Sequence, residues 1–167
     1  MSNEFLSEGV KIAKLPSDYG STGFKMFKGS FLNNVEVAYE TWGTLSINHD
    51  NVILLFTGLS PSSHAASSES NKSSGWWEYM IGPGKSINTN KYFVICISSL
   101  GSCFGSTSPA SINKKTGLVY GLDFPELSIE DIAKAGHSTL QTLGIDHVHT
   151  VIGPSMGGMT ALAYALL

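Results

Sequence analysis

A serine between two glycines, in the run Gly153-Pro154-Ser155-Met156-Gly157, has the residue types and spacing best suited to covalent chemistry. The run has the pattern G-x-S-x-G and lies between an apolar stretch, residues 148–152, and an Ala/Leu-rich stretch. In a nucleophile elbow the serine occupies a sharp strand-to-helix turn, and the glycines leave room for neighbouring backbone. The pattern predicts Ser155 as a nucleophile and the backbone N–H of Met156 as a donor to an oxyanion, with the helix dipole adding stabilisation.

The same serine needs partners. A serine hydroxyl is a weak nucleophile until a base takes its proton, and in enzymes with a catalytic elbow the acid and the histidine follow the serine in the chain. The sequence ends at Leu167, so neither partner is predicted within it. A plain tight turn between strand and helix is the alternative interpretation, because 18 glycines in 167 residues can produce the pattern by chance.

Hydrophobic patterning predicts the strands that must hold this turn. Residues 24–31 and 34–42 are expected to form two antiparallel edge strands joined at Asn33-Asn34, since apolar and polar residues alternate in the second. Residues 52–56 and 92–97 are continuous apolar runs, which are typical of parallel strands covered on both faces by helices.

A capped helix is predicted before the elbow. Ser128-Ile129-Glu130-Asp131 resembles a capping box, and Gly144 can end the helix. An apolar face at helical spacing lies between them: Ile129, Ile132, Gly136, Leu140 and Leu143. The order of strand, helix, strand, elbow and helix indicates an α/β fold class, with antiparallel edge strands before a parallel β-α-β unit, in one domain over residues 1–167.

Two long polar loops, residues 57–75 and 100–125, are predicted to be ordered, because aromatic and apolar residues interrupt both. After the first loop, Trp76 and Trp77 open a short helix-like segment. These tryptophans are expected either to line a binding site or to anchor the core and its rim. Gly82-Pro83-Gly84-Lys85 lacks the spacing of a phosphate-binding loop and is interpreted as a turn.

Composition narrows the class of partner. The formal net charge is −3 and all ten basic residues are lysine, so the chain offers no field for nucleic acid and no arginine clamp for an anion. Cys96 and Cys103 have no metal-ligand spacing, which favours a reduced, cytoplasmic protein without a metal. Residues 1–16 mix charged and apolar types, so neither a signal peptide nor a membrane span is predicted.

Several longer motifs occur in register along the chain. They are Gly75-Trp76-Trp77 with Ile81-Gly82-Pro83-Gly84-Lys85, then Tyr92-Phe93-Val94-Ile95-Cys96, Leu100-Gly101-Ser102-Cys103-Phe104-Gly105-Ser106-Thr107, Pro109-Ala110-Ser111, and Gly153-Pro154-Ser155-Met156-Gly157-Gly158-Met159. In order and spacing they resemble the homoserine O-acyltransferase family of the α/β-hydrolase fold. The resemblance covers nearly the whole chain and implies that more sequence normally follows.

This resemblance implies transfer of an acetyl or succinyl group from acyl-CoA to the hydroxyl of L-homoserine, through an acyl ester on Ser155 and as a step of methionine biosynthesis. Acyl-CoA would be a co-substrate, with no cofactor held by the protein. No nucleic acid or membrane partner is implied, and a homodimer of the full-length form is left open. The second oxyanion N–H would come from the loop after the first parallel strand, at Leu59 or Gly58.

Departures from the family's commoner form leave the substrates open. Residues 56–61 read Phe-Thr-Gly-Leu-Ser-Pro in place of a His-Ala-Leu-Thr-Gly form, so the donor can be acetyl or succinyl and the acceptor L-homoserine or L-serine. The resemblance implies three substrate contacts: Trp76 and Trp77, which would line a tunnel for the acyl or pantetheine group, and Lys134. Lys134 stands where many relatives have arginine and lacks the planar fork of an arginine. Pro154 replaces a commoner glycine, and its fixed φ suits the turn.

Other roles compete with these assignments. His64 lies nearest the predicted oxyanion loop and is interpreted either as a general base or as a residue that orders the loop or lines a pocket. For the whole chain, the alternatives to an acyltransferase are a catalytically inactive remnant, an interaction module and an esterase-type hydrolase.

Overall fold

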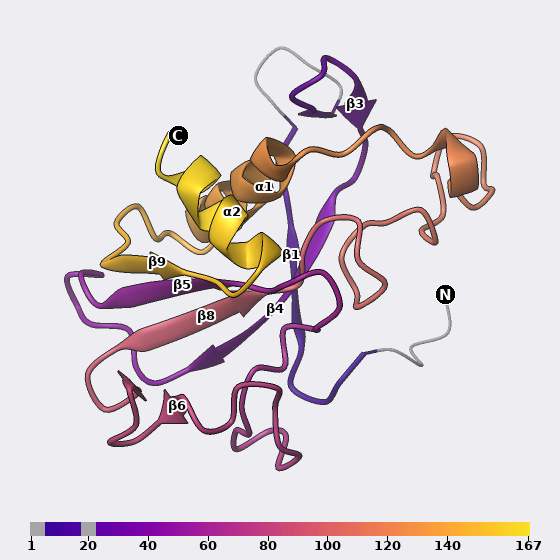
Figure 1. Cartoon of the computed structure of the whole chain (residues 1–167). Coiled ribbons are helices and arrows are strands. Elements are labelled where there is room, and N and C mark those ends of the chain that lie inside the picture. Colours follow the sequence, from indigo (N-terminus) through magenta and orange to yellow (C-terminus); the bar gives the residue numbers. More distant parts are fainter. Residues whose placement is uncertain (1–5, 18–22) are drawn as a thin grey trace.

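The computed structural model describes residues 6–17 and 23–167, and its centre is a mixed five-stranded sheet (Figure 1). The strand order is β1-β4-β8-β5-β9. The strands are β1 (Lys11–Lys14), β4 (Glu36–Trp42), β8 (Phe93–Ile97), β5 (Val52–Phe56) and β9 (Thr150–Ile152). β5 pairs in parallel with β8 and β9, whereas β4 pairs antiparallel with β8 and β1. The predicted fold class, antiparallel edge strands beside a parallel unit, is confirmed.

The apolar runs become the buried strands of the sheet. All five residues of β5 are buried, and so are four of the five in β8. β-Branched and leucine side chains on both faces of these strands need cover on both sides, which is the arrangement expected of central parallel strands. The parallel strands expected at residues 52–56 and 92–97 are confirmed, but within the described part of the chain helices cover only one of their faces, so the expected helical cover of the other face is wrong.

The prediction for residues 24–31 is wrong. This stretch forms only β2 (Phe24–Lys25), which turns at residues 27–30 and pairs with β3 (Phe31–Leu32) in a separate two-stranded ribbon. β4 instead pairs with β1, so the antiparallel edge of the sheet is β1. Gly29 has a φ of 90°, and the Gly29 N–H donates to the Met26 carbonyl, which closes the turn inside the predicted strand.

The predicted capped helix is α1 (Ile129–Thr142). The Ser128 hydroxyl accepts from the Asp131 N–H, and the Asp131 carboxylate accepts from the Ser128 N–H at 2.9 Å, so the capping box is complete. The same carboxylate accepts from the Phe27 N–H at 2.7 Å, which ties the β2 ribbon to the helix. Gly144, with a φ of 71°, follows the helix end.

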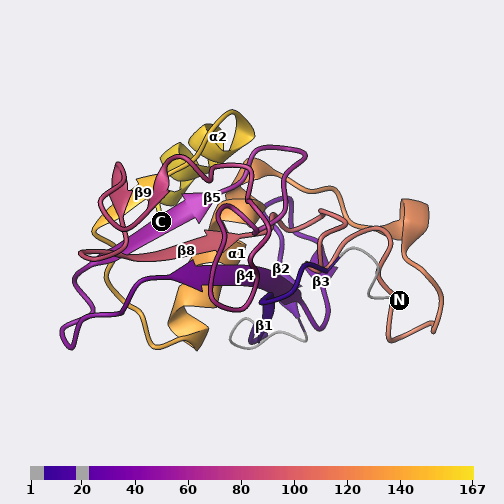
Figure 2. The same ribbon diagram turned by 90° about the horizontal axis from the view of Figure 1, so that it is seen from below.

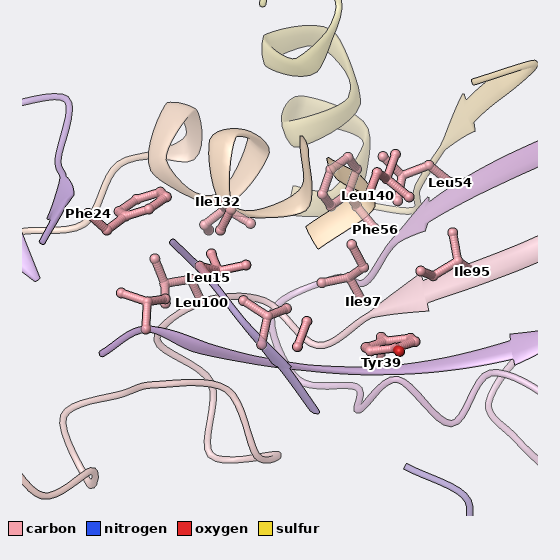
Figure 3. Close-up of a cluster of buried hydrophobic side chains, with 14 of the residues drawn as sticks. Leu15, Phe24, Tyr39, Leu54, Phe56, Ile95, Ile97, Leu100, Ile132 and Leu140 are labelled. Carbon is pink, nitrogen blue, oxygen red and sulfur yellow. The ribbon is translucent and has the colours of Figure 1, made fainter. Parts of the chain in front are cut away.

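Both helices, α1 and α2 (Met156–Tyr164), cover one face of the sheet (Figure 1). Figure 3 shows the core on that side, where Leu54 and Phe56 of β5 and Ile97 of β8 lie near Ile132 and Leu140 of α1. Close packing requires Gly136, because a Cβ there would lie 2.6 Å from the Phe56 ring.

The other face is covered by the chain between β5 and β8. In Figure 2 this segment crosses in front of the sheet, with α1 behind it. Its apolar members, among them Ala65, Ala66 and Ile81, pack on Trp42, Ile53, Leu55 and Val94 of the strands. The segment includes β6 (Ile81–Gly82) and β7 (Ile87–Asn88) with the predicted turn between them. Trp76 and Trp77 lie in a turn, so the predicted short helix there is wrong.

The second long loop, residues 100–125, contains only a short 3-10 helix, η2 (Gly121–Asp123). Serine hydroxyls attach it to the sheet: the Ser106 hydroxyl accepts from the Ala38 N–H at 3.0 Å and donates to the Ser98 carbonyl at 2.6 Å. Thr107 likewise accepts from the Glu36 N–H at 2.8 Å. The loop is therefore ordered, as predicted, by hydrogen bonds to β4 and β8.

Candidate active site

The predicted nucleophile lies at a strained turn between β9 and α2. Ser155 has φ 53° and ψ −124°, a conformation that an L residue rarely adopts, and it is the N-cap of α2. The Gly157 N–H donates to the Pro154 carbonyl at 2.9 Å, which tightens the turn. Ser155 is exposed, so its hydroxyl is open to a substrate. The strand-to-helix elbow predicted from the G-x-S-x-G pattern is confirmed.

The glycines of the elbow are required by the backbone around it. A Cβ on Gly153 would lie 2.4 Å from the Gly157 backbone, and a Cβ on Gly157 would lie 2.4 Å from the Phe56 carbonyl oxygen. Contacts below 3.0 Å are forbidden to carbon, so any side chain would force α2 away from β5.

The predicted oxyanion loop lies beside the serine. β5 and β9 are parallel neighbours, so their carboxyl ends meet at one edge of the sheet, and the loop after β5 reaches the elbow after β9. A Cβ built on Gly58 would lie 3.8 Å from the Cβ of Ser155. Met156 is the first residue of α2, where an amide has no partner within the helix. Within the described residues, the Leu59 N–H donates no hydrogen bond either.

Residues 58–62, which we call the oxyanion arc, are held at both ends. Before the arc, the hydroxyls of Thr57 and Ser99 are 3.2 Å apart. After it, the Ser63 N–H donates to the Ser98 hydroxyl at 2.8 Å, and the Trp76 indole N–H donates to the Ser62 carbonyl at 2.9 Å. Within the arc Leu59 and Ser60 are exposed, Leu59 at 76%, whereas Gly58 is buried.

His64 does not act on Ser155 in this structure. Its Nδ1 lies 3.0 Å from a carboxylate oxygen of Glu40, and its Nε2 lies 2.9 Å from the Ser73 carbonyl oxygen. Both ring nitrogens are therefore occupied, and the interpretation of His64 as a general base is wrong. Its contacts support the alternative, ordering of the loop.

Glu40 is a residue that sequence patterning missed. The alternation in residues 34–42 favours an exposed Glu40, but it is 2% exposed because the loop after β5 covers that face of β4. Its carboxylate accepts from the Ser7 hydroxyl at 3.0 Å as well as facing His64. Burial raises the pKa of the neighbouring Cys96 thiol well above its usual range, and the Glu40 carboxylate adds to this shift, so Cys96 is an unreactive core thiol.

A second carboxylate holds the far end of the same loop. Glu78 accepts from the Ser67 N–H at 2.6 Å and from the Gly75 N–H at 3.2 Å, and it pairs with the Lys85 ammonium. These hydrogen bonds, led by the one from the Ser67 N–H, lower the pKa of Glu78 to about 2. The Lys85 side chain is thus part of a loop anchor.

The implied substrate contacts lie in different places. The rings of Trp76 and Trp77 stack with centroids 5.2 Å apart and pack on the core beneath the loop, with Trp76 also bonded to the oxyanion arc. The Lys134 ammonium donates to the Lys25 carbonyl at 2.8 Å and lies 4.4 Å from the centre of the Phe24 ring, beside the β2 ribbon. Substrate binding by Trp76, Trp77 and Lys134 stays a prediction.

The described part of the chain contains no hydrogen bond from Ser155 to a histidine or a carboxylate. Nor does it contain a cluster of three or more metal-binding side chains, or a helix long and apolar enough to cross a membrane.

Comparison with known proteins places the elbow in a family. Residues 51–167 match the model of the alpha/beta hydrolase fold. Over 143 residues the chain is 64% identical to a serine O-succinyltransferase of Litchfieldella anticariensis, covering 86% of this chain and 39% of that protein. It is 52% identical to one from Stenotrophomonas maltophilia, covering 98% of this chain and 43% of that protein.

Solved structures show the same likeness. A homoserine O-acetyltransferase from Bacillus anthracis superposes with a TM-score of 0.80 at 38% identity, over 96% of this chain and 44% of that one. Esterase E22 gives the same TM-score and identity over 92% and 42%. The chain spans about two-fifths of the length of these relatives. These similarities confirm the resemblance predicted from the motifs, and the chain belongs to the alpha/beta hydrolase fold family.

Proposed function

We propose that the polypeptide carrying this chain is an O-acyltransferase that moves an acetyl or succinyl group from acyl-CoA to the hydroxyl of L-homoserine. The observation that carries the proposal is the elbow: Ser155 lies exposed at a strained strand-to-helix turn, with Gly58 of the β5 loop against it. Relatives named as O-acyltransferases share this part of the chain at 52% and 64% identity.

The geometry supports a two-step reaction. The Ser155 hydroxyl attacks the thioester carbonyl of acyl-CoA, and the thiol leaves with a proton, so that the acyl group is held as an ester. The acceptor hydroxyl then attacks this ester and frees the serine. In both steps the negative oxygen lies at the Met156 N–H and at the Leu59 or Gly58 N–H, where preorganised donors stabilise it.

Neither step needs a bound cofactor, because acyl-CoA itself supplies the activated acyl group. The base that takes the Ser155 proton and the acid that orients it are proposed to lie outside residues 1–167, following the chain order of this fold. Both cysteines are unpaired, which fits the reducing cytoplasm. With L-homoserine as acceptor, the reaction would serve methionine biosynthesis.

The acceptor and the acyl group define the finer alternatives. The two relatives described above are named for serine and succinyl, and the Bacillus anthracis structure for homoserine and acetyl. Esterase E22 superposes equally well, which favours hydrolysis as the second candidate function. The alternatives differ only in which acyl group is bound to Ser155 and in which hydroxyl, that of an amino acid or of water, accepts it.

The test uses the natural polypeptide that carries residues 1–167. Rapid quench after mixing with acetyl-CoA or succinyl-CoA, without acceptor, should leave an acyl mass on Ser155, and Ser155→Ala should abolish it. L-homoserine, L-serine or buffer alone is then added to the trapped ester. An O-acyl amino acid supports transfer and identifies the acceptor, whereas release only to water would assign a hydrolase. A serine that never acquires the acyl mass would contradict the proposed function.

A further inference from the structure

Glu40 and His64 form a buried polar pair that the reaction itself does not use. Glu40 lies on β4, in the interior of the sheet, and His64 lies on the loop that follows β5. Their side chains are 3% and 10% exposed, and the contact from Nδ1 to the carboxylate is 3.0 Å long. A buried pair of this kind is destabilising unless its hydrogen bonds are complete, so the contacts around it constrain its protonation.

Both ring nitrogens of His64 face acceptors. A carbonyl oxygen such as that of Ser73 only accepts, so Nε2 must carry a proton. On the other side, the second proton of the pair lies between Nδ1 and the Glu40 carboxylate. The Ser7 hydroxyl donates to the other carboxylate oxygen at 3.0 Å, and the Ser63 hydroxyl at 3.4 Å. With this second proton present, every polar atom of the pair has a partner.

The pair fixes the chain at the point where the oxyanion arc ends. Ser63 and His64 directly follow residues 58–62, and both contact Glu40. The start of the arc is fixed at Thr57, next to β5. A five-residue arc with two fixed ends has little freedom, so the direction of the Leu59 and Gly58 N–H groups depends on where His64 is held.

We propose that Glu40 and His64 are positioning residues for the oxyanion site: their hydrogen-bonded pair clamps the loop after β5 to β4 and thereby aims the Leu59 or Gly58 N–H at the acyl oxygen on Ser155. The proposal rests on the proposed function for its catalytic consequence. The clamp itself is a property of the loop.

The first test is the kinetics of His64→Ala in the natural polypeptide that carries this chain, with acetyl-CoA or succinyl-CoA as donor. Loss of one N–H group that binds the oxyanion lowers kcat about 10²–10³-fold. An N–H group that is present but badly aimed should therefore lower kcat about 10- to 100-fold. The KM for acetyl-CoA or succinyl-CoA should change less than about threefold, because the Leu59 or Gly58 amide acts mainly in the transition state. An unchanged kcat would overturn the proposal.

Glu40→Gln separates the hydrogen bonds from the charge. The glutamine NH₂ can donate to Nδ1 of a neutral His64 whose Nε2–H still reaches Ser73, and its carbonyl oxygen can accept from Ser7 and Ser63. We expect this variant to keep kcat within about threefold, while Glu40→Ala should fall with His64→Ala, since a lost buried partner is not replaced. If glutamine lowers kcat as much as alanine does, the hydrogen-bonded clamp is wrong.

Glu78→Gln is the matched control. Glu78 binds the same loop through Ser67 and Gly75, beyond the clamp, so its loss should lower stability and leave kcat within about threefold. If His64→Ala does not fold, His64→Leu replaces it. Leucine fills much of the same space but makes no hydrogen bond to Glu40, so kcat must again fall.

Hydrogen exchange measures the clamp without any turnover. In His64→Ala the hydrogen-bonded amides of Ser63 and Ala65, at the end of the oxyanion arc, should exchange faster than in the wild type, while Glu78→Gln should leave them unchanged. Equal exchange in the wild type and in His64→Ala would overturn the proposal even in a protein with no acyltransferase activity. A wild type that never forms an acyl ester on Ser155 would instead contradict the proposed function alone.

Discussion

Ser155 shows how one residue combines chemistry with backbone strain. Its φ of 53° and ψ of −124° bring the hydroxyl out of the turn, and a non-glycine residue held in a sparsely populated region loses about 1–3 kcal/mol of stability. The strain persists because the turn joins a sheet strand to a helix packed on the same sheet. Under the proposed function, the reaction therefore requires a serine at a position whose backbone conformation favours glycine.

We predict that Ser155→Gly is more stable than Ser155→Ala by about 1–2 kcal/mol, because glycine adopts this conformation freely. Both variants lack the nucleophile and should lose at least about 10⁴-fold in kcat. Urea unfolding of the pair measures the difference in free energy, and wild-type protein supplies the reference. A glycine variant no more stable than the alanine variant would show that the turn is unstrained.

The site was predictable from the sequence where chemistry is local. The elbow, the Met156 amide and the Gly58 loop follow from a short motif and from the carboxyl-end rule for parallel strands. The burial of Glu40 and its pairing with His64 were not predictable, because both depend on a loop folding across β4 from elsewhere in the chain. The contacts of Lys134 with Lys25 and Phe24 likewise depend on a ribbon that patterning did not predict.

At the scale of elements, the contact between α2 and β5 positions Ser155, the proposed nucleophile. The backbone of α2 approaches the end of β5 so closely that a Cβ on Gly157 would lie 2.4 Å from the Phe56 carbonyl oxygen and 2.8 Å from that of Thr57. Gly158, one residue further on, has its nearest contact with the Gly153 carbonyl oxygen at 3.1 Å. Only the first glycine is enforced by another element.

We predict that Gly157→Ala lowers the free energy of unfolding by about 2–4 kcal/mol, since backbone must move to admit the methyl group. Gly158→Ala is the control and should cost less than about 1 kcal/mol, because the higher helix propensity of alanine offsets the tight contact. Thermal unfolding of both variants compares them directly. Equal destabilisation would mean that the close approach to β5 does not determine the effect.

The loop after β5 should carry a measurable pH dependence through Glu78. The pKa of this carboxyl is lowered from 4.5 to about 2 in the folded protein, so its contribution to stability is fully present above pH 4.5 and is lost as the pH falls toward 2. We expect Glu78→Gln to remove about 1–2 kcal/mol of the change in stability over this range, after allowance for its partial exposure. Urea unfolding of both proteins at a series of acid pH values measures this change. If the free energy of unfolding falls with pH by the same amount in both proteins, the prediction is wrong.

Helices and strands whose formation depends on their own residues were predicted well. Those whose formation depends on the segments they pair with were predicted poorly. β5, β8 and α1 have strong apolar runs or a complete capping box, and each was predicted closely. Residues 24–31 have enough apolar character for a strand, but the turn at Gly29 and the tie from Phe27 to Asp131 convert them into a short ribbon. The alternation of apolar and polar residues within one strand does not indicate which other strand it will pair with.

At the scale of the whole molecule, one edge carries apolar surface without cover in this chain. Among the described residues β9 is the last strand of the sheet and pairs with β5 alone, and none of its three residues is fully buried. Beside it, α2 and the turn after it expose Met159, Leu162 and Leu166 at 54%, 74% and 89%. Their spacing sets them on one helical face, and an apolar face beside an open strand edge favours association.

We predict that the 167-residue polypeptide, prepared alone, self-associates through this face. Burying two leucines contributes about 1.5–3 kcal/mol each, so Leu162→Lys with Leu166→Lys should weaken association at least about tenfold. The control is Ile47→Lys with Leu122→Lys, two apolar residues that are even more exposed and lie far from α2 in the sequence, and it should leave association unchanged. Sedimentation over a range of concentrations measures both. If the control weakens association as much as the α2 variant does, the contact is a general property of exposed apolar side chains, and the α2 face has no special part in it.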